Sequence, residues 1–342
     1  MKKLLNTLYV TTQDSYLRKD GETVVVEKDK NVLLRLPIHT LQGIVTFGNV
    51  MTSPFLLNLC AERGVCVSFM SEAGRFLARV TGPVSGNVHL RLAQMRAYED
   101  KSTKGNIAKC FVIGKLMNTR NAILRCLRDH GDTAVLRATE EKILDVLRRV
   151  RDSPPDAERL RGLEGEAAAD YFSAFNDMVV SSDREAFAIS SRNRRPPLDP
   201  MNALLSYLYT LLAHDCRGAL EGVGLDPQIG FLHELRPGRP SLALDLMEEF
   251  RAVMADRVAL SMVNLRQLSP KDFSATESGA VLIKDDARKN ILATWQKKKQ
   301  ENVTHPFLDE KMPVGLLPHV QALLLARHLR GDLDAYPPFI MK

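Results

Sequence analysis

Two acidic side chains three residues apart, Asp245 and Glu248, are the first candidates for chemistry in this sequence. This spacing puts both on one face of a predicted helix, next to apolar residues that belong to a protein core. Because a buried charge without a partner is strongly destabilising, the pair needs a counter-charge. A divalent cation would supply it, and so would an arginine such as Arg236 or Arg251. Ser241 stands where it could cap the helix.

A histidine and a further glutamate could complete a ligand set. His233 follows an apolar stretch and precedes a turn rich in proline and glycine. Glu164 lies in a segment rich in alanine and glycine and shares a helix face with Tyr171, two turns later. Taken singly, a structural histidine and a surface glutamate are the ordinary interpretations. Together with the acidic pair, they suit Mg²⁺ or Mn²⁺ better than a structural zinc, with open positions for phosphate oxygens.

Composition, and the absence of the short motifs of well-known enzymes, exclude several classes of function. The sequence carries no Walker loop, no GxGxxG after a strand, no HExxH, no GxSxG and no zinc-finger spacing. In its 342 residues, 47 Lys and Arg against 41 Asp and Glu give a net charge of +6, which permits an anionic partner without requiring one. The five scattered cysteines are typical of reduced thiols, and no stretch approaches the ~18–20 apolar residues that span a bilayer. These features predict a cytoplasmic protein.

The first 90 residues are rich in β-branched and aromatic residues. Their pattern predicts short strands, a turn at Asp20-Gly21, and a helix that begins at Pro54 after Ser53. The expected strands cover residues 6–11, 22–27, 32–37, 43–48, 65–69 and 76–80, with a turn at 72–74 between the last two.

From about residue 90 onward, apolar residues recur at helical spacing. The expected helices lie within residues 106–128, 134–150, 157–176, 201–220, 241–265 and 315–330. Three lysines at 297–299 are expected on a solvated helix face. The predicted fold class is therefore α+β, with a small β-rich N-terminal domain at residues 1–90 and a larger all-α C-terminal catalytic domain at residues 91–342.

Short motifs spread over nearly the whole chain resemble one known family. They lie at residues 8–11, 45–48, 86–91, 163–165, 192–197, 233–234, 244–251, 305–307, 321–322 and 326–331. In this order and spacing they resemble the CRISPR-associated adaptation integrases, the "Cas-one" family, and most of all the version found with subtype I-C systems. One departure is Ala252, where many members have proline.

The resemblance implies a metal site. Its ligands would be Glu164, His233 and Glu248, and its metal Mg²⁺ or Mn²⁺. Asp245 would be a fourth catalytic residue, one that contacts the ligands rather than the metal itself. The local rivals are Glu166 and Glu249. Glu164 is preferred because it occupies the Glu-Gly motif, and Glu248 because it shares a helix face with Asp245.

The resemblance also implies a reaction and partners in antiviral defence. The protein would insert short duplex DNA, as new spacers, into a CRISPR array by attack of a 3′-hydroxyl on a repeat-boundary phosphodiester. With water as the nucleophile, the same site would be an endonuclease. The implied partners are double-stranded DNA, a second copy of the chain held through the β-rich domain, a second small adaptation protein ("Cas-two") in a heterohexamer, and an iron–sulfur adaptation nuclease.

Basic residues in the helical region are candidate contacts to DNA phosphates. They are Arg192, Arg194, Arg195, Arg236, Arg239, Arg251, Lys284, Arg288, Lys289 and Arg327. Two other functions remain open. The chain could be a non-catalytic DNA-binding assembly subunit whose acidic cluster pairs with Arg236 and Arg251. It could also be a metal-dependent hydrolase of small phosphoesters.

Overall fold

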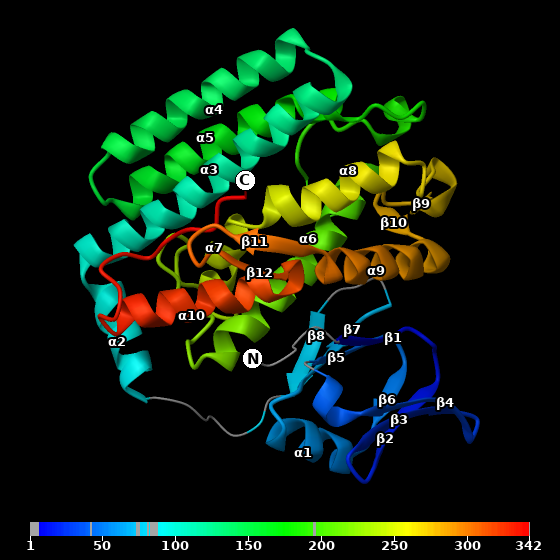
Figure 1. Cartoon of the computed structure of the whole chain (residues 1–342). Coiled ribbons are helices and arrows are strands. Elements are labelled where there is room, and N and C mark those ends of the chain that lie inside the picture. Colours follow the sequence, from blue (N-terminus) through cyan, green and yellow to red (C-terminus); the bar gives the residue numbers. More distant parts are fainter. Residues whose placement is uncertain are drawn as a thin grey trace. The chain divides into compact units, whose positions relative to one another are not determined.

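The computed structural model of the chain describes residues 7–41, 43–72, 76–80, 82, 88–193 and 196–341. It divides into two compact units, coloured along the sequence in Figure 1. The first unit comprises Met1–Gly86, Lys289–Glu301 and Pro313–Leu316, and the second comprises Asn87–Arg288, Asn302–Met312 and Leu317–Lys342. In these described ranges, no helix is long and apolar enough to cross a membrane.

Two four-stranded sheets and one helix make up the β-rich region of the first unit (Figure 1). The first sheet has the order β1 (Thr7–Val10), β5 (Gly43–Phe47), β7 (Cys66–Met70), β8 (Phe76–Val80). The second has the order β4 (Asn31–Pro37), β3 (Thr23–Lys28), β2 (Ser15–Asp20), β6 (Val50–Thr52). The helix α1 (Pro54–Glu62) starts as expected, because the Ser53 side chain accepts a hydrogen bond from the Leu56 N–H.

The strand predictions for this region are confirmed, but they lacked β2 and β6. Strand β2 has six residues and ends in three charged ones, so its sequence shows no polar–apolar alternation, and β6 has only three residues. The expected turn at Asp20-Gly21 is present, with Gly21 at a φ of 58°, and it joins the antiparallel strands β2 and β3. Buried side chains from both sheets and α1 form one core, including Leu17, Ile44 and Leu56. The expected turn at 72–74 falls partly outside the described residues.

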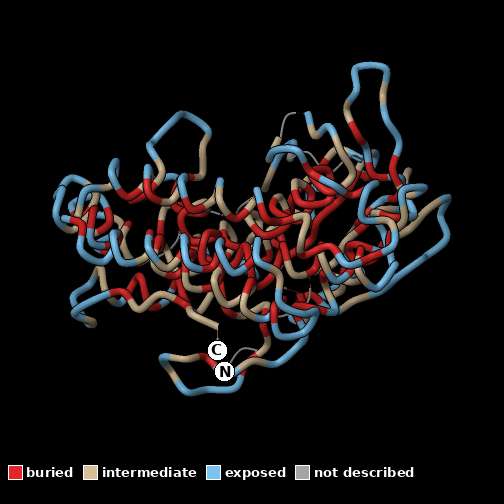
Figure 2. The backbone as a smooth tube through the Cα atoms, turned by 90° about the horizontal axis from the view of Figure 1, so that it is seen from above, coloured by how far each residue is buried: buried red, intermediate tan, exposed pale blue. Residues whose placement is uncertain are grey.

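Helices make up most of the second unit, which confirms the α+β fold class. They are α2 (Val88–Glu99), α3 (Lys101–His130), α4 (Ala134–Asp152), α5 (Ala157–Ser173), α6 (Pro200–Gly222), α7 (Ser241–Glu248), α8 (Arg257–Asn264) and α10 (Leu317–Leu329), while α9 (Asp285–Gln300) continues into the first unit. Asp100, Thr133, Asp156 and Asp199 cap the first turns of α3, α4, α5 and α6. Buried positions recur along these helices, whereas many connecting loops are exposed (Figure 2).

Short non-α elements were not predicted in the C-terminal region. Two antiparallel hairpins pair β9 (Phe273–Ala275) with β10 (Val281–Ile283), and β11 (Asn302–His305) with β12 (Glu310–Pro313). Five short 3₁₀ turns of the described chain lie at Ile38–Thr40, Phe175–Met178, Arg184–Phe187, Pro270–Asp272 and Val314–Leu316. Strands of three or four residues are too short to show a periodic pattern, so the prediction of an all-α region was wrong in this detail.

Three local predictions were also wrong. The expected helix at 241–265 is divided into α7, a π-helical turn at Arg251–Asp256, and α8. Ser241 is the first residue of α7 rather than its cap, because its hydroxyl donates to the Glu234 carbonyl at 2.9 Å. Of the three lysines expected on a solvated face, Lys298 and Lys299 are buried.

Candidate active site

Asp245 of α7 holds the segment that carries His233. Its buried carboxylate accepts hydrogen bonds from the backbone N–H groups of Phe231, Leu232 and His233 at 2.5, 3.0 and 2.9 Å. The same carboxylate lies 2.7 Å from Nδ1 of the His233 ring. Because Nδ1 is engaged with Asp245, the other ring nitrogen, Nε2, is directed to the Glu248 side, where it lies 3.9 Å from Oε1.

Gly230 makes this close approach possible. A Cβ atom at this position would lie 2.7 Å from the Ser241 backbone and 2.8 Å from Oδ2 of Asp245. Such distances are shorter than any normal carbon contact, so a side chain here would push the His233 segment away from α7. At the other end of the segment, Glu234 forms an ion pair with Arg161 of α5. The His233 segment is therefore attached to two helices.

Lys115 of α3 connects the two candidate glutamates. Its ammonium forms an ion pair with Oε1 of Glu164 on α5 and lies 2.8 Å from Oε2 of Glu248 on α7. Arg251 approaches the other oxygen of Glu248, with Nη2 3.0 Å from Oε1. Two arginines were expected as counter-charges of the acidic pair. Arg251 pairs with Glu248, whereas Arg236 is exposed.

The surrounding charges keep Glu248 ionised. Burial alone would raise the pKa of this carboxyl, but Arg251, then Lys115 and His233, outweigh that effect and lower its pKa to about 2. Glu248 is therefore a carboxylate at neutral pH although its side chain is only 2% exposed. An ionised carboxylate is the form that can ligate a metal ion.

The two local rivals lie in different surroundings. Glu166 forms a pair of hydrogen bonds with Arg149 at the exposed side of α4 and α5. Glu249 is buried among neutral donors, accepting from the Tyr336 hydroxyl at 2.6 Å and the Phe339 N–H at 2.8 Å. Burial raises the pKa of Glu249 to about 8, against the hydrogen bonds that favour its charged form. Neither rival joins the group formed by Glu164, His233 and Glu248.

The donor set suits a hard divalent cation. In the described part of the chain, no three His, Cys, Asp or Glu side chains already stand at metal-ligand spacing. A cation nevertheless lies between two of the three candidate ligands, because the Lys115 ammonium pairs with both carboxylates. Oε2 of Glu248 is buried and faces the Lys115 ammonium, so this oxygen is already in contact with a cation. Two carboxylates and an imidazole nitrogen are ligands that Mg²⁺ or Mn²⁺ accepts.

A comparison with known proteins identifies the family. A family model described as "CRISPR associated protein Cas1" matches residues 8–297. The chain belongs to the Cas1 family. A relative from Rhodospirillum rubrum, named CRISPR-associated endonuclease Cas1 2, is 52% identical over 100% of both chains.

Solved structures share the Cas1 fold of this chain. A CAS1 protein from Thermotoga maritima has a TM-score of 0.83 at 22% identity, over 97% of this chain and 99% of that one. A casposase bound to integration product has a TM-score of 0.83 at 24% identity, over 99% and 94%. The arrangement of a β-rich region followed by a helical domain is therefore the arrangement of known structures.

Of two further similar proteins, one is a fusion with another protein and the other is part of a complex. A relative from Geobacter sulfurreducens, named as a fusion of exonuclease Cas4 with endonuclease Cas1, is 35% identical over 98% of this chain and 60% of its own length. A chain of a complex titled Cas6-RT-Cas1–Cas2 has a TM-score of 0.82 at 22% identity, over 98% of this chain and 36% of that one.

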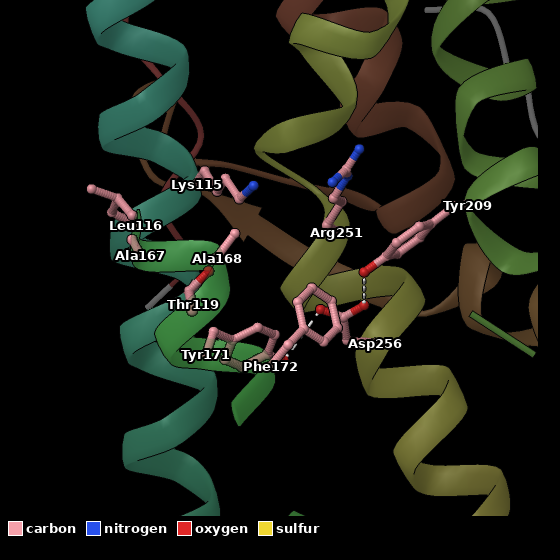
Figure 3. A pocket seen from close by; sticks show the side chains of 10 residues that line it. All are labelled: Lys115, Leu116, Thr119, Ala167, Ala168, Tyr171, Phe172, Tyr209, Arg251 and Asp256. Atoms are coloured by element: carbon pink, nitrogen blue, oxygen red, sulfur yellow. Dashed lines mark hydrogen bonds between the residues drawn. The ribbon is translucent and has the colours of Figure 1, made fainter. Parts of the chain in front are cut away.

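A small pocket adjoins the candidate site in this Cas1 chain (Figure 3). The residues that line it are Lys115, Leu116, Thr119, Ala167, Ala168, Tyr171, Phe172, Tyr209, Arg251 and Asp256. Asp256 accepts hydrogen bonds from the hydroxyls of Tyr209 at 2.6 Å and Tyr171 at 3.2 Å, drawn as dashed lines in Figure 3. Burial raises the pKa of Asp256 to about 6, against the stabilising effect of these hydroxyls and of Arg251. The π-helical turn presents both Arg251 and Asp256, and such turns recur at functional sites.

Sequence reasoning missed Lys115 and the Asp256 cluster. The one available signal for Lys115 was a charged residue in a mostly apolar stretch of a long predicted helix, between Gly114 and Leu116. Asp256 gave no signal, because its partners Tyr171 and Tyr209 are 85 and 47 positions away in the chain.

The structure separates the proposed DNA contacts into groups. Arg236, Lys284, Lys289 and Arg327 are exposed, and Arg239 is partly buried. Arg192 donates to Asn202 and Ser206, Arg251 pairs with Glu248, and Arg288 bonds to the Ile283 carbonyl and Asp285. These last three are held by the protein itself. Arg194 and Arg195 lie outside the described residues.

Proposed function

We propose that this chain is a metal-dependent DNA endonuclease and integrase of CRISPR adaptation. It inserts short duplex DNA into a CRISPR array, where a 3′-hydroxyl attacks a repeat-boundary phosphodiester. The observation that carries the proposal is the convergence of Glu164, His233 and Glu248 from three separate segments, with Lys115 between the two carboxylates. Membership of the Cas1 family supports the same reaction.

The chain's own residues prepare the site for this chemistry. Asp245 engages Nδ1 of His233, which leaves Nε2 of the ring as the nitrogen that would bind a metal ion. Arg251 and Lys115 keep Glu248 ionised and add positive charge where an anionic phosphodiester must approach. A Mg²⁺ or Mn²⁺ ion held by Glu164, His233 and Glu248 would supply further positive charge against the charge that develops on the phosphate.

The reaction needs no covalent bond to the protein. The attacking 3′-oxygen forms a new bond to phosphorus and loses its proton, while the repeat's own 3′-oxygen leaves and takes a proton up. Bond number is conserved in this exchange, so no energy-rich cofactor is required. With water as the nucleophile the same exchange is hydrolysis, which is the endonuclease activity.

The partner proposals follow from the fold and from the similar proteins. Strand β4 lies at the edge of its sheet and exposes Val32, Leu33 and Leu34, and an exposed apolar edge strand is suited to pairing with a second copy. We therefore propose a homodimer through this strand. The Cas6-RT-Cas1–Cas2 complex and the Cas4/Cas1 fusion support a second small adaptation protein and a Cas4-type nuclease as partners. The heterohexamer with the second small adaptation protein is part of the proposal. A role with subtype I-C systems stays part of this proposal.

The homodimer can be tested by light scattering after size-exclusion chromatography. Leu33→Glu places a charge in the exposed edge of β4, and the expected result is a monomer. Leu282→Glu changes an exposed leucine of β10 and should leave the dimer intact. A Leu33→Glu protein that stays dimeric would show that β4 is not the interface.

The catalytic proposal is tested by disintegration of a branched DNA that mimics a half-inserted fragment. The wild type, incubated with Mn²⁺ or Mg²⁺, should reseal the repeat strand and release the fragment, and a chelator should stop the reaction. Glu164→Ala should be inactive, whereas the matched control Glu166→Ala, two residues away and paired with Arg149, should remain active.

The same experiment distinguishes the other candidate functions. A wild type that binds the branch equally well with and without metal, and leaves it unchanged, would be a non-catalytic assembly subunit. The pairing of Glu248 with Arg251 is what that alternative expects, whereas Arg236, the other partner it expects, is exposed. A protein that cleaves a chromogenic phosphodiester but ignores branched DNA would be a hydrolase of small phosphoesters.

A further inference from the structure

Lys115 occupies an unusual position for a lysine. It lies in the middle of the 30-residue helix α3, is only 7% exposed, and has its ammonium at the two carboxylates of Glu164 and Glu248. Lysine is rarely buried, because its charge must keep a partner when it leaves water. In Figure 3 its side chain reaches toward the pocket that Arg251 and Asp256 also line. The same side chain therefore adjoins both the candidate metal ligands and the pocket beside them.

The charges of the site explain what such a lysine does. The carboxylates of Glu164 and Glu248 are paired with Lys115 and Arg251, and the Asp245 carboxylate behind His233 adds a third negative charge. These three carboxylates and two cations together carry one net negative charge. A divalent ion in the site would convert this to one net positive charge. That value complements the single negative charge of a phosphodiester. Without the lysine, the same site with its metal would be neutral and would attract a phosphodiester less.

The lysine and a metal ion need the same oxygens. Oε1 of Glu164 and Oε2 of Glu248 are the atoms that Lys115 pairs with, so both face the same ammonium, and a metal ion held by the two carboxylates would have to share or replace these contacts. An ammonium in contact with both lowers their attraction for a second cation. Arg251 does not compete in this way, because it approaches the other oxygen of Glu248.

We propose that Lys115 is an exchangeable counter-ion of the metal site. Its ammonium neutralises Glu164 and Glu248 until a divalent cation binds them, and it then turns to the DNA phosphate in the adjoining pocket. Lys115 is thus a positioning residue that lowers the affinity for the metal and retains positive charge for the substrate. The inference rests on the proposed metal site at Glu164, His233 and Glu248.

The test measures Mn²⁺ binding to the full chain without DNA, by titration with the electron paramagnetic resonance signal of free Mn²⁺. Lys115→Met removes the charge and keeps the length of the side chain. Its Kd for Mn²⁺ should be at least about tenfold lower than that of the wild type, because a unit charge a few ångströms from the ion is worth more than the ~1.4 kcal/mol that a factor of ten represents. The control is Lys142→Met, which removes an exposed lysine paired with Asp170 and should leave the Kd unchanged.

A second measurement follows thermal unfolding. With chelator, Lys115→Met should unfold at a lower temperature than the wild type, because two carboxylates then face each other without a cation. Saturating Mn²⁺ should raise its melting temperature by more than it raises that of the wild type. If Lys115→Met does not fold with chelator, Mn²⁺ should restore folding. Lys115→Gln removes the same charge but can still donate hydrogen bonds to both carboxylates, and it should show the same tightening of Mn²⁺ binding.

The outcomes separate this inference from the proposed function. If the wild type binds Mn²⁺ and Glu164→Ala abolishes binding, the metal site stands. An unchanged or weaker Kd in Lys115→Met and Lys115→Gln would then overturn the counter-ion role alone, as would failure of both variants to fold with saturating Mn²⁺. If Mn²⁺ binding by the wild type does not depend on Glu164, the proposed metal site itself is wrong.

Discussion

Glu248 and Glu249 are adjacent in the sequence and both are buried, but they face opposite surroundings. Glu248 lies between the cations Arg251 and Lys115 and beside the His233 ring, and its pKa falls to about 2. Glu249 accepts hydrogen bonds from neutral groups of the C-terminal segment, and burial raises its pKa to about 8. Burial alone therefore does not decide the charge of a carboxyl; the charge of the groups that accompany it does. The C-terminal end of α7 and its C-cap residue thus have a chemical face, at Glu248, and a structural face, at Glu249.

The strongest way to test this difference is to neutralise each glutamate in turn. Glu248→Gln should reduce DNA disintegration by about a thousandfold or more, because a proposed metal ligand and the counter-charge of Lys115 and Arg251 are lost together. Glu249→Gln keeps the shape of the residue and one acceptor oxygen for the Phe339 N–H and Gln321, and it should retain most of the activity. Circular dichroism should show both variants folded. Similar activity losses in the two would contradict the division into a chemical and a structural face.

The structural face should respond most to truncation. Glu249→Ala leaves the Tyr336 hydroxyl and the Phe339 N–H without their acceptor and creates a cavity. We expect a loss of about 4 kcal/mol in the free energy of unfolding, measured by urea denaturation. Glu166→Ala, which removes an exposed ion pair, should cost less than about 1 kcal/mol. A loss for Glu249→Ala as small as that of Glu166→Ala would show that the buried hydrogen bonds contribute little.

The two faces also show how far sequence reasoning reaches. The long helices α3 and α6 were predicted because apolar residues recur at helical spacing through residues 106–128 and 201–220, and the observed helices contain these ranges. Spacing likewise placed Asp245 and Glu248 on one face, which the shared contact with His233 shows. The surroundings of Glu249 were not predictable, because its donors at 321, 336 and 339 lie 72 to 90 residues away in the chain.

The partners of Lys115 could not be predicted from the sequence either. A single lysine in a helix is normally a solvated residue, and nothing within α3 indicates its partners, which lie 49 and 133 positions away. The pairing of the two glutamates with one ammonium depends on the packing of α3 against α5 and α7, so it belongs to the tertiary structure alone. The metal ligands themselves were assigned by family resemblance, and the structure adds the charges around them.

Asp245 allows a finer test within the chemical face. Asp245→Asn keeps the size of the side chain, but its amide cannot accept from three backbone N–H groups and also engage Nδ1 of His233. Because the imidazole loses its fixed orientation, Mn²⁺ affinity should fall about 10- to 100-fold. Isothermal titration calorimetry measures this change. An unchanged affinity, with normal folding, would mean that Asp245 does not position His233 for the metal.

Asp256 is a third buried carboxyl, and it has both a cationic and neutral neighbours. Arg251 is the cation, and the neutral groups are the hydroxyls of Tyr171 and Tyr209. Its pKa is raised from 3.8 to about 6 in the folded protein, so between about pH 4 and 6 the folded state binds more protons than the unfolded state. This group therefore makes stability fall as the pH rises through that window, and has no further effect above it. Asp256→Asn, which does not titrate, lacks this contribution.

The measurement is urea denaturation of the wild type and Asp256→Asn at several pH values from 4 to 7. The wild type should lose on the order of 2 kcal/mol relative to the variant across the window. Asp132→Asn changes an exposed carboxyl and should follow the wild type. A difference between wild type and Asp256→Asn that stays constant with pH would mean that the tyrosine hydroxyls and Arg251 stabilise the carboxylate enough to cancel its burial. Asp256 would then resemble Glu248 rather than Glu249.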